Sequence, residues 1–101
     1  MKVKELLSDE SKWVQGNFAV NSQGHYAPSS SDEACRWCIG GAILRCYRNR
    51  HYGGNGTIHS IFNKVITKLR ERGWQDGVSD WNDDGTRTFA DVQALVTELD
   101  I

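Results

Sequence analysis

The chain has 101 residues, of which 39% are hydrophobic, and a formal net charge of −1 at pH 7. This length supports one hydrophobic core, which excludes a second independent domain, so we expect a single domain over residues 1–101. The chain contains no apolar run long enough to span a membrane, no signal peptide and no disulfide framework among its three cysteines, so we expect a cytoplasmic protein with no membrane partner.

The first half of the chain begins with two short elements. Residues 2–7 are expected to form a helical turn, and the polar residues 8–11 can cap a second turn. Two apolar or aromatic runs in residues 16–27 flank the turn-forming residues 21–24 and predict a small N-terminal β-hairpin. Ser30 and Glu33 are spaced as a capping box, which predicts the start of the next helix.

That next helix, within residues 32–49, is expected to be the centre of the fold. Its residues from Trp37 to Leu44 carry no charge on any face, as in a helix surrounded by other elements. One side is lined by small residues, and Gly40 and Gly41 each cost about 1 kcal/mol relative to Ala in a helix. The two glycines therefore indicate close packing or a site on that side.

The second half of the chain predicts two amphipathic helices. One is capped by Thr57, has apolar residues at helical spacing, and stops at Gly73. Residues 73–85 are too polar and glycine-rich to predict a regular element. Thr88 and Asp91 form a capping box that opens the last helix. We therefore predict a mainly α (α+β) fold, in which two amphipathic helices pack around the central helix.

Three short motifs occur in a characteristic order. They are Trp13-Val14-Gln15-Gly16, then Trp37-Cys38-Ile39-Gly40-Gly41-Ala42, and then Trp81-Asn82-Asp83 followed by Arg87-Thr88. Together they resemble a family of short uncharacterised proteins of actinobacteria and bacteriophages, over nearly the whole chain. The resemblance implies a one-domain, plausibly phage-associated protein whose motif residues lie near one another, and it implies no activity.

Charges are sorted along the chain: eight Lys or Arg against one acid in residues 36–72, and seven acids against one Arg after Gly73. Either the two regions attract each other within the domain, or the basic region binds a partner. Nucleic acid is possible but not favoured. A candidate anion site comprises Arg48, Arg50, Gly54, Gly56 and Thr57, because helix N-termini favour anions such as phosphate. The alternative is a flexible solvated turn.

Two further hypotheses concern catalysis and metal. Cys38 near a helix start could be a thiol nucleophile with His25 or His59 as its base, although a buried structural cysteine is commoner. We therefore predict no catalytic residue and no cofactor. The spacing of Asp80, Asn82, Asp84, Thr86 and Asp91 matches a calcium loop, and the alternative is a capped loop that leads into the last helix.

The main candidate site is a cluster at the small-residue side of the central helix, which is either a packed junction or the wall of a pocket. We expect Trp81 to fill the groove of Ala34, Cys38, Gly41 and Ala42, and Arg45 to meet Asp83 in an ion pair. The predicted ligand-binding residues are Trp13, Gln15, Trp37, Gly41, Arg45, Trp81, Asn82, Asp83 and Arg87. They predict a small non-enzymatic accessory protein that acts on a host protein or on a nucleotide-like anionic ligand. A thiol enzyme and a calcium-binding module are the alternatives.

Overall fold

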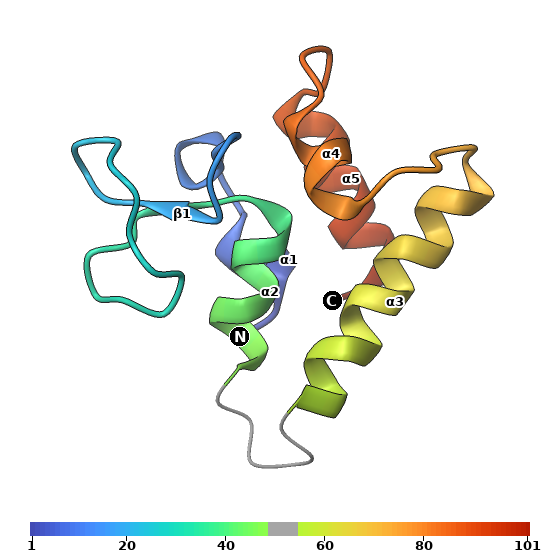
Figure 1. Ribbon diagram of the computed structural model, residues 1–101, viewed down its shortest axis with the longest axis horizontal. Helices are drawn as coiled ribbons and strands as arrows, with labels where there is room; N and C mark the ends of the chain where they lie inside the picture. Colours follow the sequence, from blue (N-terminus) through green and yellow to red (C-terminus); the bar gives the residue numbers. More distant parts are fainter. Residues whose placement is uncertain (49–54) are drawn as a thin grey trace.

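The computed structural model describes residues 1–48 and 55–101, and Figure 1 shows their arrangement. The elements are α1 (Val3–Leu6), the 3₁₀ turn η1 (Glu10–Lys12), β1 (Ala19–Val20), β2 (Arg36–Trp37), α2 (Ile39–Tyr47), α3 (Asn55–Glu71), α4 (Val78–Asp83) and α5 (Phe89–Leu99). These elements confirm the predicted α+β class. Within the described ranges, no helix has both the length and the apolar character needed to cross a membrane.

Helix α2 is the centre of the fold, as predicted. It contacts α1, α3 and α4, and its residues from Ile39 to Ile43 are buried. Helix α5 packs against α1 (Figure 1). The largest fully buried side chains of this core are Leu7, Ile39, Ile43, Leu69, Leu95 and Ile101.

The start of the central helix differs from the prediction. The helix begins at Ile39, and the predicted capping box at Ser30 and Glu33 does not open it. The reason is a competing sheet: the backbone N–H groups of Cys35 and Cys38 donate to the carbonyls of Val20 and Phe18, which keeps this segment extended. Cys38 is the N-cap instead, and its Sγ accepts a hydrogen bond from the Gly41 N–H at 3.3 Å.

The predicted hairpin is present, and the sheet extends beyond it. Asn21 and His25 close the turn through a backbone hydrogen bond of 2.8 Å, and Val20 forms an antiparallel bridge with Tyr26. The longer ladder joins β1 to β2, with Ala19 opposite Trp37. This second pairing was not predicted, because the residues of β2 were assigned to the helix.

The two glycines of α2 mark a close backbone approach. A Cβ atom built on Gly41 would lie 1.8 Å from the carbonyl oxygen of Phe18, and one built on Gly40 would lie 2.9 Å from the Phe18 ring. At Gly41 the backbone of Phe18 therefore covers this groove, which Trp81 was predicted to fill. Gly41 belongs to a packed contact that only a residue without a side chain permits.

Helices α3 and α5 follow the predicted pattern, and the segment between them differs from it. Helix α3 starts at Asn55, two residues before the predicted cap Thr57. Within residues 73–85, predicted to be irregular, the chain forms helix α4, because Val78 and Trp81 bury their side chains against the core. Thr88 and Asp91 form the predicted capping box at the start of α5.

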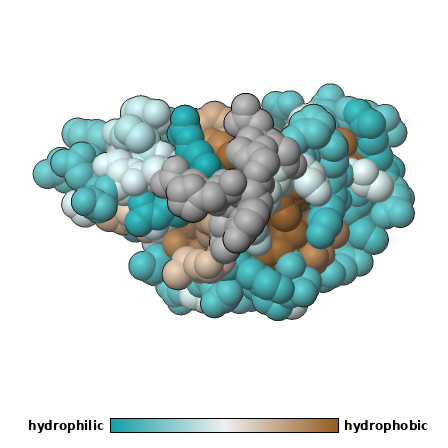
Figure 2. Space-filling model, turned by 90° about the horizontal axis from the view of Figure 1, so that it is seen from below, coloured by the Kyte–Doolittle hydropathy of each residue, from teal (hydrophilic) through white to brown (hydrophobic). Residues whose placement is uncertain are grey.

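Figure 2 looks at the end of the molecule where α2 finishes and α3 starts. Apolar side chains reach the surface near the middle of this face, and hydrophilic side chains occupy both flanks. The core cluster continues outward through half-buried hydrophobic residues of α2 and α3, among them Tyr47, Ile58 and Phe62. Some hydrophobic residues of α2 and α3 therefore remain partly exposed, and such exposure is usual in folded proteins.

Candidate ligand-binding site

The end of α3 places Trp74 at the surface. Gly73 has a φ of +89°, its N–H donates to the Arg70 carbonyl, and the Trp74 N–H donates to the Leu69 carbonyl at 2.9 Å. This is a Schellman turn, which stops the helix and satisfies its last carbonyls. The half-buried Trp74 indole is then fixed by a 3.2 Å hydrogen bond from its Nε1 to the Gly77 carbonyl.

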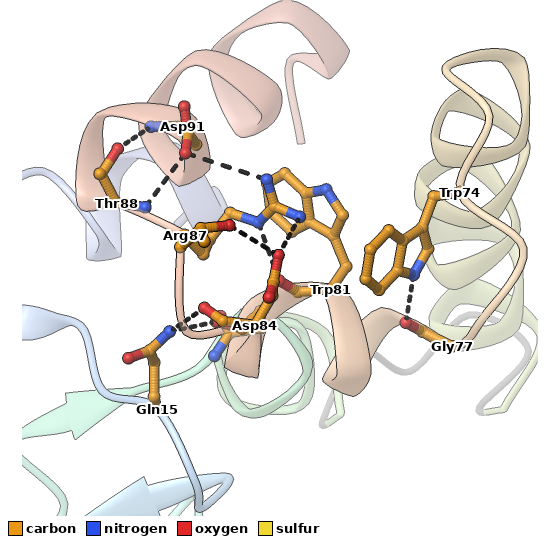
Figure 3. A network of polar contacts seen from close by, with 10 residues as sticks. Gln15, Trp74, Gly77, Trp81, Asp84, Arg87, Thr88 and Asp91 are labelled. Atoms are coloured by element: carbon orange, nitrogen blue, oxygen red, sulfur yellow. Dashed lines mark hydrogen bonds and ion pairs between the residues drawn. The ribbon is translucent and has the colours of Figure 1, made fainter.

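Helix α4 and the turn after it bring Arg87 onto Trp81. The Trp81 side chain is buried, and the Arg87 Nε donates to the Trp81 carbonyl at 2.9 Å. The guanidinium carbon lies 3.9 Å from the centre of the Trp81 ring and 5.6 Å from that of Trp74. Figure 3 shows these three side chains together. Stacking of this kind stabilises an arginine that is only 15% exposed.

Two carboxylates balance the charge of Arg87. Asp84 lies 3.7 Å from one terminal nitrogen of the guanidinium, and Asp91 lies 3.9 Å from the other (Figure 3). The Thr88 backbone N–H donates to Asp91, and this hydrogen bond is the main cause of the lowered pKa of the Asp91 carboxyl. Asp91 therefore combines the capping of α5 with a charge opposite Arg87.

These side chains surround a pocket of about 380 Å³ between the end of α3, α4 and α5. Its volume is within the range of about 300–1,000 Å³ typical of small-molecule sites. We call it the Trp74–Arg87 pocket, and it is lined by Arg72, Gly73, Trp74, Trp81, Arg87, Asp91 and Ala94. A larger depression, of about 570 Å³, lies along the outer face of α3, but no Trp, Tyr or Phe among the described residues lines it, so we favour the smaller pocket.

Asn82, predicted to bind ligand, is the centre of a packed junction. Its side chain is fully buried, and its Oδ1 accepts hydrogen bonds from Trp13 Nε1 at 2.8 Å and from the Ile39 N–H at 3.1 Å. Its Nδ2 donates to the Val14 carbonyl and to the Asp83 carboxylate. All four hydrogen bonds of the amide are thus made within the protein, which leaves none for a ligand.

The neighbours of Asn82 extend the same junction. Gln15 donates from Nε2 to the backbone carbonyls of Asn82 and Asp84, at 2.9 and 3.0 Å. Asp83 accepts from the Gly16 N–H at 3.0 Å. These contacts hold the segment after η1 against α4, and Gln15 is seen beside Asp84 in Figure 3. The predicted convergence of the first and third motifs is therefore present, as a structural junction.

Trp37 reaches the junction through its backbone, which forms a parallel bridge with Trp13 and accepts from the Val14 N–H, and its side chain contacts Arg45. Arg45 lies over the Trp37 ring at 5.5 Å and donates to the carbonyl of Ser31 at 2.9 Å. Trp37 Nε1 donates to the Ser29 carbonyl. The predicted ion pair of Arg45 with Asp83 is wrong, because backbone carbonyls of the loop before β2 hold the guanidinium. Of the nine predicted ligand-binding residues, only Trp81 and Arg87 line the Trp74–Arg87 pocket.

The sequence interpretation missed five of the seven lining residues of this pocket: Arg72, Gly73, Trp74, Asp91 and Ala94. Trp74 follows directly after the glycine that stops α3, and an aromatic side chain at that position lies beside the helix end. The position of Trp74 directly after Gly73 was the signal from which its place in the pocket could have been predicted. Asp91 was recognised as a capping residue and as a calcium-ligand candidate, but not as part of this pocket.

Cys38 and His59 do not form a catalytic pair. Cys38 is buried just before the first turn of α2, and burial is the main cause of the raised pKa of its thiol. His59 is exposed near the start of α3, which follows the opposite end of α2 (Figure 1). A thiol with a raised pKa is poorly ionised at neutral pH. The burial of Cys38 and the position of His59 near the other end of α2 therefore both oppose the thiol-enzyme alternative.

The five residues of the calcium hypothesis have other roles. Asp80 and Asn82 lie within helix α4, so the segment does not wrap as a calcium loop. Asp84 accepts from the Thr86 hydroxyl at 2.9 Å and faces Arg87, whereas Asp91 caps α5. Across residues 1–48 and 55–101, no group of three or more His, Cys, Asp or Glu side chains could hold a metal ion.

The predicted anion site falls partly outside the described residues. Arg50 and Gly54 lie in the segment that the structure leaves undescribed. Arg48 is exposed at the end of α2, and Gly56 and Thr57 lie inside α3, which begins at Asn55. Thr57 is therefore not the N-cap, and the expectation that it caps the helix is wrong.

Comparison with known proteins gives one match. A family described as a family of unknown function (DUF6197) matches residues 1–99. Searches of the curated proteins and of the solved structures yield no match to the chain.

Proposed function

The chain belongs to this family of unknown function, DUF6197, and on that premise we propose that it is a small non-enzymatic protein that binds a nucleotide-like ligand in the Trp74–Arg87 pocket. The supporting observation is the arginine that stacks on Trp81 beside the half-buried Trp74. Tryptophan and arginine are enriched among the residues that carry most of the binding energy at protein interfaces, and both offer flat surfaces for stacking. The rest of the pocket is formed by helix ends, which are rigid supports for a site.

The four indole N–H groups provide the test. In a ¹H–¹⁵N correlation spectrum, Trp74 and Trp81 report on the pocket, whereas Trp13 and Trp37 are held by Asn82 and by the Ser29 carbonyl. We expect at least one of the four 5′-ribonucleoside monophosphates to shift the Trp74 and Trp81 signals saturably and to leave those of Trp13 and Trp37 in place. If none of the four shifts the Trp74 and Trp81 signals, the proposed function is wrong.

A protein partner is the second candidate, in line with the expectation of a phage-type accessory protein acting in a bacterial host. Phe18 and Tyr26 favour it, since these aromatic side chains beside β1 are 46% and 65% exposed. Aromatic residues are enriched at interfaces. Native mass spectrometry of wild-type protein and of Tyr26→Ser, each purified from the host, should show a bound partner that the variant loses. Equal retention by both proteins would exclude this surface.

A further inference from the structure

The hydrogen bonds of Arg87 leave part of its guanidinium available. Among the described residues, only its Nε makes a hydrogen bond, to the Trp81 carbonyl at 2.9 Å. The two terminal nitrogens lie 3.7 and 3.9 Å from the carboxylates of Asp84 and Asp91, which is beyond hydrogen-bond length. Arg87 lines the pocket, so its terminal N–H groups can donate to a bound molecule.

The charges around the pocket decide what kind of acceptor suits Arg87. Asp84 and Asp91 face its guanidinium, and the other lining arginine, Arg72, is paired with Glu98. Two arginines are thus opposed by three carboxylates. A phosphate in the pocket would meet carboxylates of its own sign, whereas an uncharged acceptor such as a ring nitrogen or carbonyl oxygen would not.

Asp91 supplies an acceptor beside these donors. In the described part of the chain, its hydrogen bond from the Thr88 N–H and its contact with Arg87 both involve Oδ2. Its other carboxylate oxygen, Oδ1, can accept from a molecule in the pocket. The pocket therefore pairs a donor from Arg87 with an acceptor from Asp91, on side chains whose charged ends are 3.9 Å apart.

Trp74 adds a flat apolar wall. Its only polar atom already donates to the Gly77 carbonyl at 3.2 Å, so the ring can contribute only through its surface. Stacking of a base on an aromatic side chain is tolerant of sequence, because every base has a flat face. The pocket of about 380 Å³ is large enough for one such ring.

We infer that the Trp74–Arg87 pocket takes the uncharged heteroaromatic ring of a nucleobase, with a ring acceptor on Arg87, a ring donor on Asp91 and one face against Trp74. This inference rests on the proposed function and specifies it: the base enters the pocket, and the phosphate stays outside. It predicts that a nucleoside binds without its phosphate and that inorganic phosphate alone does not bind.

The test compares nucleosides with inorganic phosphate, using the indole N–H signals. Adenosine, guanosine, cytidine and uridine are titrated separately, and we expect at least one to shift the Trp74 and Trp81 signals with an affinity within about threefold of its monophosphate. If the monophosphates and inorganic phosphate shift these signals and no nucleoside does, the inference is wrong and the proposed function stands. If neither the nucleosides nor the monophosphates shift them, both are wrong.

Variants then test the three contacts. Trp74→Ala should weaken binding about tenfold or more, whereas Trp74→Phe keeps a ring and should bind within about threefold of wild type. Arg87→Lys keeps the charge but loses the planar fork, and we expect a loss of about tenfold. Asp91→Asn should change which of the four nucleosides binds best, because an amide can donate as well as accept.

The control is Gln93→Ala, because Gln93 is an exposed residue of α5 that does not line the pocket. The affinity of this variant for the nucleoside should equal that of wild type. Unmoved Trp13 and Trp37 signals in each free variant establish that the fold is intact. Equal binding by wild type, Trp74→Ala and Arg87→Lys would overturn the inference. A short single-stranded oligonucleotide, tested in parallel, separates the two sources of a base: tighter binding than the nucleoside identifies nucleic acid, and weaker binding identifies a free nucleotide.

Discussion

The Trp13 indole donates a 2.8 Å hydrogen bond to the Asn82 side chain, although 69 positions separate the two residues in the chain. The same amide oxygen accepts the first N–H of α2, from Ile39. One fully buried side chain therefore joins the N-terminal segment, the central helix and α4. Removing such a residue should lower the free energy of unfolding by more than its size indicates, since several buried groups are left without hydrogen-bond partners.

Asn82→Ala is the direct test of this junction. Loss of the amide leaves the Ile39 N–H, Trp13 Nε1 and the Val14 carbonyl without partners, so we expect the free energy of unfolding to fall by about 3 kcal/mol or more. Urea unfolding followed by circular dichroism measures it. The matched control is Asn63→Ala on the exposed face of α3, where the change should stay within about 0.5 kcal/mol. Similar values for both variants would contradict the role of the junction.

Gly41→Ala tests the close contact with Phe18. Alanine favours a helix by about 1 kcal/mol over glycine, yet here its Cβ would lie 1.8 Å from a backbone oxygen, which cannot move without shifting the sheet. We expect the variant to lose about 2–3 kcal/mol of stability or to fail to fold. Gly85→Ala is the control, because a Cβ there meets no atom within 4 Å. A thermal melt in which Gly41→Ala is as stable as wild type would show that the chain at Phe18 yields.

Cys38 is expected to behave as a structural cap. Cys38→Ala removes the Sγ acceptor of the Gly41 N–H and leaves a small cavity, with an expected loss of about 1–2 kcal/mol, whereas Cys38→Ser keeps an acceptor and should lose less. Because burial raises the pKa of the Cys38 thiol, a thiol reagent at neutral pH should label it more slowly than the half-buried Cys35. Mass spectrometry of the labelled protein distinguishes the two sites, and faster labelling of Cys38 would contradict this assignment.

Asp100 gives a prediction for acid stability. Hydrogen bonds and ion pairs from Lys2 and Lys4 lower the pKa of its carboxyl from 3.8 to about 2. The folded protein therefore binds the proton less readily than the unfolded chain does, so this contribution to stability is present above about pH 4 and is lost as the pH falls through 2. Asp100→Asn should lower the Tm at pH 5 and reduce its fall between pH 4 and pH 2. Parallel Tm profiles for variant and wild type would show that the ion pairs contribute nothing.

The helical spacing of apolar residues and the capping residues predicted the long helices α3 and α5. The apolar spacing of α3, its stop at Gly73 and the Thr88–Asp91 box are local signals, and each corresponds to contacts within one element. The start of α2 was predicted wrongly because a capping box is also local, whereas the pairing of β2 with β1 is a contact between distant segments. Helix α4 was missed for a related reason: burial of Val78 and Trp81 outweighs the poor helix propensity of the residues around them.

The candidate site was predicted in part. The order of the motifs indicated that residues of all three motifs lie near one another, and hydrogen bonds do join Trp13, Gln15 and Ile39 to Asn82. Hydrogen bonds decide which of these residues face a pocket, and residue spacing in the sequence does not encode them. The sequence could therefore not distinguish the residues of the Asn82 junction from those of the Trp74–Arg87 pocket. Trp74 belongs to no periodic pattern, and its place beside Arg87 follows only from the turn at Gly73.

The junction at Asn82 also constrains the order in which the chain can fold. Its hydrogen bonds to Ile39, Val14 and Trp13 reach partners 43 to 69 positions away, so they close large loops and form only after most of the chain entropy has been lost. Helices α3 and α5 can form early from local contacts, whereas the segment around Trp13 needs both its bridge to Trp37 of β2 and its hydrogen bond to Asn82 of α4. The N-terminal segment should therefore be the last part to gain protection in refolding, and substitutions at Asn82 should accelerate unfolding more than they slow folding.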